Sequence, residues 1–335
     1  MPVLSIGDQS MNFMSLRNGG EIKSSLARLS NELSSGKAAD ITAHLGGDTR
    51  QFSGLAHSLR ILSAHQSTLR DTSLVLDHMQ TSLDHFNSSR ENIMSEFLTL
   101  GPVGVSTNFS QLAASGRDAF DSLVSTLNAE IGGKSLFAGS ALDANALSTG
   151  TAMLDDIRSR LVGATTQTQV EDVVDAWFND TGGGFETLGY TGDVGSHQSR
   201  RIGSDSVSEI AIRADDPRVR SVLHGVALGV VAAEMSNVLL AKDQASLLQS
   251  AGARLLKSAE GMVELQGYLG GLQSSLEVNR SRSEAEQTAV QIAINELSTI
   301  DPFETASKLQ AIQLQLETHF TVSARLSQLN FAEYI

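Results

Sequence analysis

One short segment has the residue types of a nucleotide site. Gly133-Lys134-Ser135 ends like a phosphate-binding loop, in which a lysine and a hydroxyl hold the phosphates. Such a loop has a second glycine five residues before Gly133, but this chain has Asn128 there, and no buried strand precedes it. We therefore expect no nucleotide site, and the sequence indicates no other cofactor.

Four histidines form a second group that could carry chemistry, namely His57, His65, His78 and His85. A metal site needs three or four ligands that converge on the ion. None of the spacings in this group matches a known ligand set. We interpret these histidines as solvated or flanking positions on a helix and expect no metal ligands.

Two pairs of adjacent acids, Asp155-Asp156 and Asp215-Asp216, could be general acid–base pairs. Adjacent residues on a helix do not face each other, however, and helix capping is the simpler interpretation of both pairs. The chain has no cysteine, which excludes disulfides, thiolate metal ligands and a cysteine nucleophile. The sequence thus predicts no catalytic residue and no enzyme.

The composition favours long helices and excludes several kinds of partner. The chain has 335 residues, a net charge of −14 and only four prolines, and it is 41% hydrophobic but 5% aromatic. This acidic balance argues against nucleic acid and against an anionic membrane surface. No apolar run reaches the roughly 18 residues of a membrane-spanning helix. We therefore expect neither nucleic-acid binding nor membrane insertion.

Apolar residues recur at helical spacing through most of the chain. Sustained heptad patterns predict two long helices that form a coiled coil. The middle of the chain alone shows mixed signals, with short helical patches, a flexible glycine triplet and one or two hairpins between residues 185 and 214. The expected helices cover residues 11–35, 51–98, 108–131, 151–162, 168–178, 243–298 and two further segments that begin at Asp216-Pro217 and Asp301-Pro302.

The layout is nested, which predicts a mainly α fold. The N- and C-terminal halves form a long antiparallel helical coiled-coil bundle with a small mixed α/β insertion. We expect three domains. Residues 1–45 with 299–335 are terminal assembly helices, residues 46–131 with 216–298 are the coiled-coil domain, and residues 132–215 are the insertion with a β-hairpin.

The two ends of the chain carry matching apolar stripes. Two short helices alone bury too little area to offset the entropy of ordering them. We therefore expect the terminal helices to fold on assembly with a partner. The stripes consist of Ile22, Leu26, Leu29 and Leu33 near the start, and Leu309, Ile312, Leu316 and Phe320 near the end.

Four segments carry a resemblance to a known family. Residues 26–37, LARLSNELSSGK, resemble the N-terminal signature of flagellins and of the hook-associated proteins that join the flagellar filament to its hook. Residues 133–140, GKSLFAGS, and the tail at 324–335, ARLSQLNFAEYI, resemble the same group, the tail most closely its hook–filament junction proteins. Tyr190-Thr191-Gly192-Asp193 is similar to the small β insertion of that family. The residues after Lys37 depart from the usual Asp-Asp-Pro stretch, which indicates a divergent branch.

The resemblance implies a flagellin-like fold and a structural role. Such a protein is exported unfolded through the flagellar type III apparatus and is located outside the cell in the flagellum. Its terminal helices then fold by coiled-coil packing with neighbouring subunits. The implied partners are copies of the chain itself, an adjacent hook-associated protein, flagellin and an export chaperone. The candidate subunit-packing residues are Leu26, Leu29, Leu33, Leu316, Phe320, Leu326 and Leu329.

Two alternatives remain open from the sequence. A short flagellin, the subunit of the filament, would share all of these motifs. A cytoplasmic helical scaffold or signalling protein with a permanent coiled coil would share the heptads, but its terminal helices would be stable in the isolated monomer.

Overall fold

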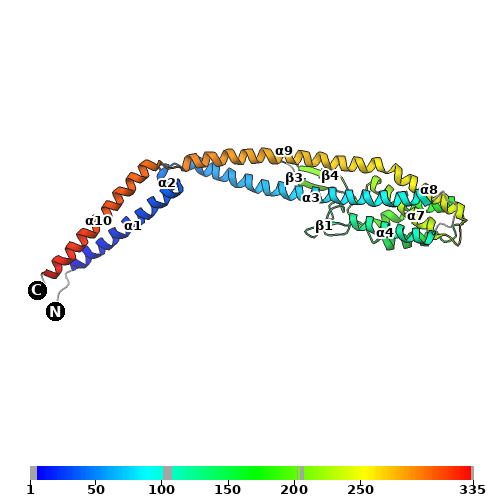
Figure 1. The fold of residues 1–335 in the computed structure, drawn as a ribbon, viewed down its shortest axis with the longest axis horizontal. Coiled ribbons are helices and arrows are strands. Elements are labelled where there is room, and N and C mark those ends of the chain that lie inside the picture. Colours follow the sequence, from blue (N-terminus) through cyan, green and yellow to red (C-terminus); the bar gives the residue numbers. More distant parts are fainter. Residues whose placement is uncertain (1–5, 101–107, 202, 204–206, 333–335) are drawn as a thin grey trace. The chain divides into compact units, whose positions relative to one another are not determined.

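The computed structural model describes residues 6–100, 108–201, 203 and 207–332, and it is mainly helical (Figure 1). Long helices pack on one another, and two small antiparallel sheets complete the described chain. The predicted fold class is thereby confirmed. The helices are α1 (Ile6–Ser35), α2 (Ile41–His44), α3 (Arg50–Leu100), α4 (Phe109–Leu127), α5 (Gly150–Arg160), α6 (Gln167–Asn179), the π-helix η1 (Phe185–Gly189), α7 (Pro217–Glu234), α8 (Ala241–Lys257), α9 (Ala259–Ser298) and α10 (Pro302–Ala332).

The chain forms two compact units. Residues 1–64 and 284–335 form unit 1, and residues 65–283 form unit 2. The helices α3 and α9 each contribute to both units. The three-domain division drawn from the sequence stays a prediction.

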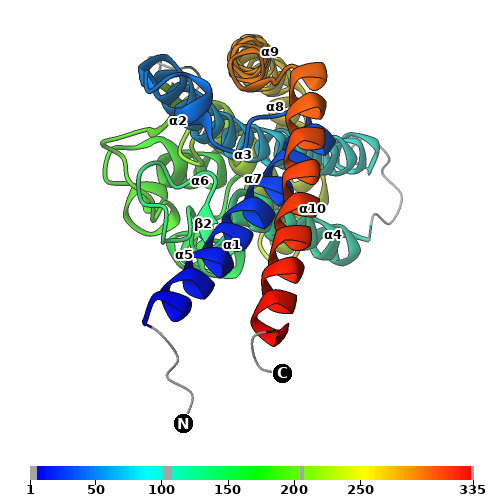
Figure 2. The ribbon, with the colours of Figure 1, turned by 90° about the vertical axis from the view of Figure 1, so that its left-hand side faces the viewer.

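In unit 1 the two terminal helices α1 and α10 lie side by side and run antiparallel (Figures 1 and 2). The segments that connect them to the rest of the chain also pair, because Ala38 N donates to Ser298 O at 2.8 Å and Ile300 N donates to Gly36 O at 3.2 Å. Gly36 has φ +70°, which allows it to end α1 as a left-handed cap. The predicted stop after Ser35 is confirmed.

Unit 2 is built around α7, which is apolar on all sides. Every residue from Val222 to Ala233 is buried, as expected of a central helix that others surround. Close packing depends on its glycines, because a Cβ on Gly229 would lie 2.1 Å from the Phe97 ring and one on Gly225 would lie 2.8 Å from Leu255. The predicted start of this helix is confirmed, since Asp216 caps it and Pro217 is its first residue.

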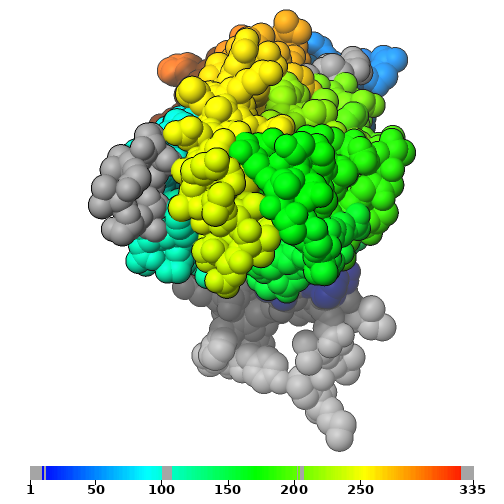
Figure 3. All heavy atoms as spheres, turned by 90° about the vertical axis from the view of Figure 1, so that its right-hand side faces the viewer, coloured from blue at the N-terminus to red at the C-terminus, as the bar shows by residue number. Residues whose placement is uncertain are grey.

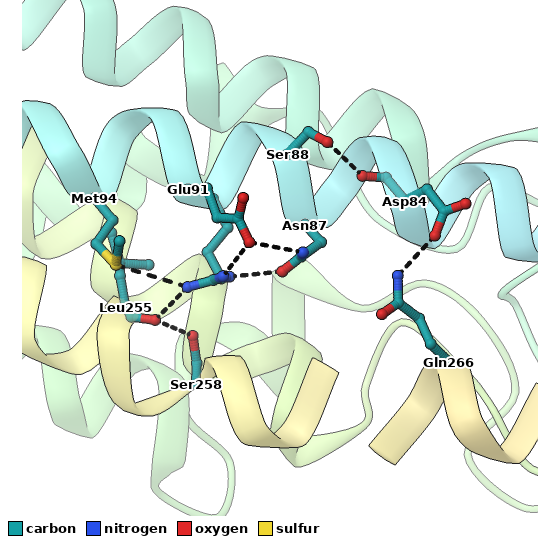
Figure 4. A network of polar contacts seen from close by, with 9 residues as sticks. Asp84, Asn87, Ser88, Glu91, Met94, Leu255, Ser258 and Gln266 are labelled. Atoms are coloured by element: carbon teal, nitrogen blue, oxygen red, sulfur yellow. Dashed lines mark hydrogen bonds and ion pairs between the residues drawn. The ribbon is translucent and has the colours of Figure 1, made fainter. Parts of the chain in front are cut away.

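The helix predicted over 243–298 is in fact two helices, α8 and α9, that meet at Ser258. Figure 4 shows the reason. The buried Arg90 guanidinium of α3 donates to Leu255 O at 2.8 Å, and Ser258 Oγ donates to the same carbonyl at 2.7 Å. A continuous helix would use Leu255 O for its own i→i+4 bond. The heptad pattern runs through the break without a change, so it gave no sign of it.

The helix predicted over 108–131 ends earlier, at Leu127, and the hairpin β1 (Glu130–Ile131) and β2 (Lys134–Ser135) follows. Gly132 and Gly133 form its turn with φ of +57° and +73°, the backbone that a tight two-residue hairpin requires. The expected hairpin in the 185–214 region is present as β3 (Gln198–Arg201) paired with β4 (Val207–Ile210).

Two residues of the glycine triplet, Gly183 and Gly184, are buried in the packed core, whereas Gly182 is exposed. A Cβ on Gly184 would lie 1.8 Å from Trp177 Nε1, and one on Gly183 would lie 2.7 Å from Ala176 O. Trp177 itself is 1% exposed and its Nε1 donates to Asp156 at 2.6 Å. These glycines are required because the chain passes directly over the indole ring.

Candidate assembly surface on the terminal helices

The segment that resembles a phosphate-binding loop has the wrong structure for one. Gly133 lies in the hairpin turn, and Lys134 and Ser135 form a strand. A phosphate-binding loop needs a helix N-terminus after the lysine, because the free N–H groups there hold the anion. The expectation of no nucleotide site at this segment agrees with its geometry.

The four histidines do not converge. Their positions are all on α3, where His57, His78 and His85 are exposed and His65 is half-buried. Within the described ranges, no group of three or more His, Asp and Glu side chains could hold a metal ion. A separate finding concerns membranes: none of the helices described is both long and apolar enough to span one.

The acid pairs have structural partners, and capping explains only one of the four residues. Asp216 caps α7, and it also pairs with Arg218 at 2.8 Å. Asp215 binds Arg213 at 2.8 Å. Asp155 and Asp156 lie inside α5, which is capped by Thr149 instead. The capping interpretation was therefore wrong for Asp155 and Asp156, whose carboxylates bind Arg158 and Arg160.

Two of the segments that carry the family resemblance contact each other in unit 2. Asp193 N donates to Ala138 O at 3.0 Å, and the Ser140 hydroxyl binds the Asp193 carboxylate. A Cβ on Gly139, whose φ is +65°, would lie 2.7 Å from Asp193 O. Residues 138–140 thus pack against Asp193, and these residue types contribute to the fold of unit 2.

The predicted subunit-packing residues fall into three groups. Leu29 is 6% exposed, and Leu26 and Leu316 are half-buried. Leu33 and Phe320 are 38% and 52% exposed. Leu326 and Leu329 are outside the side chains that the structure describes. The role of all seven between subunits stays a prediction.

The structure shows why Leu33 and Phe320 point outward. A polar residue takes the inner position beside each of them. In α1 this residue is Glu32, which is 8% exposed and accepts a hydrogen bond from Ala39 N at 3.1 Å. In α10, His319 Nε2 lies 3.0 Å from Ser15 O, and the ring lies against Gly19 of α1. Counted from Leu29 in α1 and from Leu316 in α10, the polar residue at i+3 faces inward. The apolar residue at i+4 remains outside in both helices.

The α1–α10 pair leaves a broad set of large apolar side chains uncovered. Phe13 and Leu16 of α1 are 73% and 72% exposed, and Leu314 of α10 is 64% exposed. Burying one such side chain is worth about 1.5–3 kcal/mol. Together with Leu33, Phe320 and Val322 they make up the exposed apolar side chains of the terminal pair. These side chains lie on more than one side of the two helices, and we call them its outer face: Phe13, Leu16, Leu33, Leu314, Phe320 and Val322.

Four of these residues were missed from the sequence. Phe13, Leu16, Leu314 and Val322 lie outside the two stripes, and the sequence pattern did not single them out. The signal that could have found them is an apolar residue out of phase with the stripe of its own helix. A helix with two apolar faces has a second surface to cover.

Comparisons with known proteins agree with the fold. No family model matches the chain, and no curated protein does. Among solved structures the chain is similar to a "putative flagellar hook-associated protein from Vibrio parahaemolyticus", with a TM-score of 0.52 and 14% sequence identity. The match covers 73% of this chain and 95% of that one. At this identity the likeness shows a common fold.

Proposed function

We propose that the chain is a structural subunit of the bacterial flagellum that acts at the junction between hook and filament. The single observation that supports this most is the outer face of the terminal pair. Large apolar side chains on both α1 and α10 stay exposed after the two helices have paired. Soluble monomers rarely expose such an apolar surface to water, whereas neighbouring subunits in a polymer of helices would cover it.

Two independent lines support the flagellar setting. The motifs at residues 26–37, 133–140 and 324–335 resemble those of flagellins and hook-associated proteins. The solved structure with a similar fold is described as a flagellar hook-associated protein. On this proposal the chain is not an enzyme and is exported through the flagellar type III apparatus. Its partners are its own copies, a neighbouring hook-associated protein, flagellin and an export chaperone.

Deletion of the gene tests the junction role. A junction protein is needed to attach the filament, so the deletion strain should carry hooks without filaments and release flagellin into the medium. Complementation with the intact chain should restore filaments. Full filaments in the deletion strain would contradict the junction role. A deletion strain whose hook–filament junction stays in place would indicate a short flagellin instead.

The outer face has its own test. Leu16→Asp and Phe320→Asp should each abolish filament attachment while leaving the far-ultraviolet circular dichroism of the monomer unchanged. Val162→Asp is the matched control, because Val162 is 86% exposed but lies in unit 2. Normal motility in both α1 and α10 variants would remove the support that this surface gives. A cytoplasmic scaffold would instead be indicated if the intact protein stayed inside the cell.

A further inference from the structure

A cationic hollow lies in unit 2 where three helix ends meet, and it is separate from the terminal helices. The cavity has a volume of about 630 Å³ and is lined by the first turns of α7, the last turns of α8 and the start of α9. Figure 3 shows this end of the unit, where the yellow residues of α8 lie against the green residues of α6.

The lining of the hollow is positive and rich in hydroxyl groups. Of its nine residues, three are cationic (Arg218, Arg254 and Lys257) and three are serines, and none of the nine is acidic. The whole chain has 38 acidic residues against 24 lysines and arginines. The wall of the hollow is therefore cationic although the chain as a whole is acidic.

Arg218 is held in place before any ligand arrives. Its guanidinium donates to both carboxylate oxygens of Asp216, at 2.9 and 2.8 Å, and also lies 3.5 Å from the Glu264 carboxylate. Its aliphatic stem crosses α9 at Gly261, where a Cβ would lie 2.9 Å from Arg218 Cγ. Arg218 therefore forms a fixed wall of the hollow, and because its charge is already paired, the donors for an anion are the other lining residues.

The remaining hydrogen-bond donors of the hollow have few partners within the protein. Arg254 makes one long ion pair, 3.8 Å from Asp175. Lys257 makes no ion pair, and the hydroxyls of Ser221 and Ser250 make no hydrogen bond, among the described residues. These groups come from two helices and surround the hollow. Together they can satisfy an acceptor that carries oxygens in several directions.

Helix ends add to the positive field. The N-termini of α7 and α9 both border the hollow, and each carries a partial positive charge. The C-terminus of α8 would oppose them, but its Leu255 carbonyl is bound by Arg90 and Ser258 on the side of α3. The negative end is thus partly neutralised.

We propose that this hollow binds a tetrahedral oxyanion, a phosphate or sulfate group, through Lys257, Arg254 and the hydroxyls of Ser221 and Ser250. A carboxylate offers its acceptors in one plane, whereas a tetrahedral group offers them to donors on separate helices. The binding group is either a free ion or part of a larger molecule. Inorganic phosphate and a sulfated polysaccharide are the two probes that separate these sources.

Nuclear magnetic resonance titration of the full chain with inorganic phosphate tests the site. Saturable shifts should appear at Ser221, Ser250 and Lys257, and Lys257→Gln should weaken binding about tenfold, the loss of one charged hydrogen bond. Lys242→Gln is the matched control, because Lys242 is exposed on α8 but does not line the hollow. Arg254→Gln should weaken binding as Lys257→Gln does.

Several outcomes would overturn the proposal. They are an absence of saturable shifts, equal shifts with sodium chloride at matched ionic strength, equal affinity for acetate, and unchanged affinity in both Lys257→Gln and Arg254→Gln. Circular dichroism of each variant checks that it is folded. If the sulfated polysaccharide binds at the same residues more tightly than phosphate does, the natural ligand is a larger molecule.

Discussion

Unit 1 and unit 2 are built from the same kinds of helix but differ in how they use apolar residues. Unit 2 holds a contiguous core that includes seven phenylalanine and tryptophan side chains with under 2% exposure. In unit 1 the buried hydrophobic residues among those described are Ile22, Leu29 and Ile300. Its large side chains at positions 13, 16, 303 and 314 are all more than 60% exposed.

The difference shows that an apolar stripe on a helix does not indicate whether the surface that covers it lies in the same chain or in another molecule. Unit 2 satisfies its own pattern, because α7 is enclosed on all sides. Unit 1 covers one face of each terminal helix and leaves the other, so its stability depends on what else is present. The following predictions test that contrast, beginning with the largest effect.

Two phenylalanines provide the sharpest test. Phe97→Ala should lower the free energy of unfolding by about 3–5 kcal/mol, because the ring is fully buried against Gly229. Phe320→Ala should change it by less than about 0.5 kcal/mol in the monomer, because Phe320 is 52% exposed. Urea titrations followed by circular dichroism measure both. Equal losses would mean that the two units are equally well packed.

The pH dependence of unfolding should reside in unit 2. Burial, with help from Arg254, lowers the pKa of His224 from 6.5 to about 4, against the attraction of Asp175. Between these pH values the unfolded chain binds a proton that the folded chain does not. Stability from this residue is therefore intact above pH 6.5 and falls as the pH drops to 4, by about 3 kcal/mol.

The variant His224→Gln isolates that contribution. Whatever it costs at neutral pH, its unfolding free energy should fall less steeply than that of the wild type between pH 6.5 and 4. His57→Gln, at an exposed position on α3, should keep the wild-type slope. If His224→Gln also keeps that slope, the buried imidazole does not control acid stability.

A polar cluster at the end of α7 should matter less than the core but more than any surface pair. The Glu234 carboxylate binds Arg158 at 2.7 and 2.8 Å and Arg117 at 3.2 Å, which joins α7 to α5 and α4. Glu234→Gln should cost about 1–3 kcal/mol, since these bonds are charged and partly shielded. Glu286→Gln, at an exposed position in the middle of α9, is the control and should be neutral.

The smallest effect is expected at the polar connection in unit 1. Lys37 Nζ donates to Asn295 Oδ1 at 3.0 Å in an exposed hydrogen bond. Lys37→Ala should change the unfolding free energy by less than about 0.5 kcal/mol. A loss above that in thermal melts would show that this connection stabilises unit 1 more than its exposure indicates.

Local signals in the sequence predicted much of the fold. Asp216-Pro217 and Asp301-Pro302 start helices because capping depends on residues a few positions apart, and Gly36 ends one for the same reason. The break at Ser258 was missed because it depends on Arg90, which is distant in the chain. The inner positions of Glu32 and His319 were missed because a stripe admits either an i+3 or an i+4 step.

The packed glycines illustrate the same limit. Gly184 lies against Trp177, and a sequence pattern cannot distinguish a glycine that bends from one that makes room for a ring. On the terminal helices the stripes located one covered face. The outer face required the structure, because exposure is a property of the pair rather than of either helix.

The Arg90 contact also affects the register in which α3 and α9 pair. Gln266 and Gln273 of α9 bind Asp84 and Asp77 of α3, and each pair is one heptad from the next. If α9 slid by seven residues, Gln273 would meet Asp84 and Arg280 would meet Asp77, so the repeating contacts would survive the error. Periodic contacts therefore carry no information about which of these alignments is correct.

Arg90 supplies that information because its target occurs once. Leu255 O is freed at the α8–α9 break, whereas seven residues later the carbonyls lie within an uninterrupted helix. A slipped pairing would leave a guanidinium of 3% exposure facing a carbonyl already in use. In this molecule the repeating contacts hold α3 and α9 together, and the single break between α8 and α9 fixes their register.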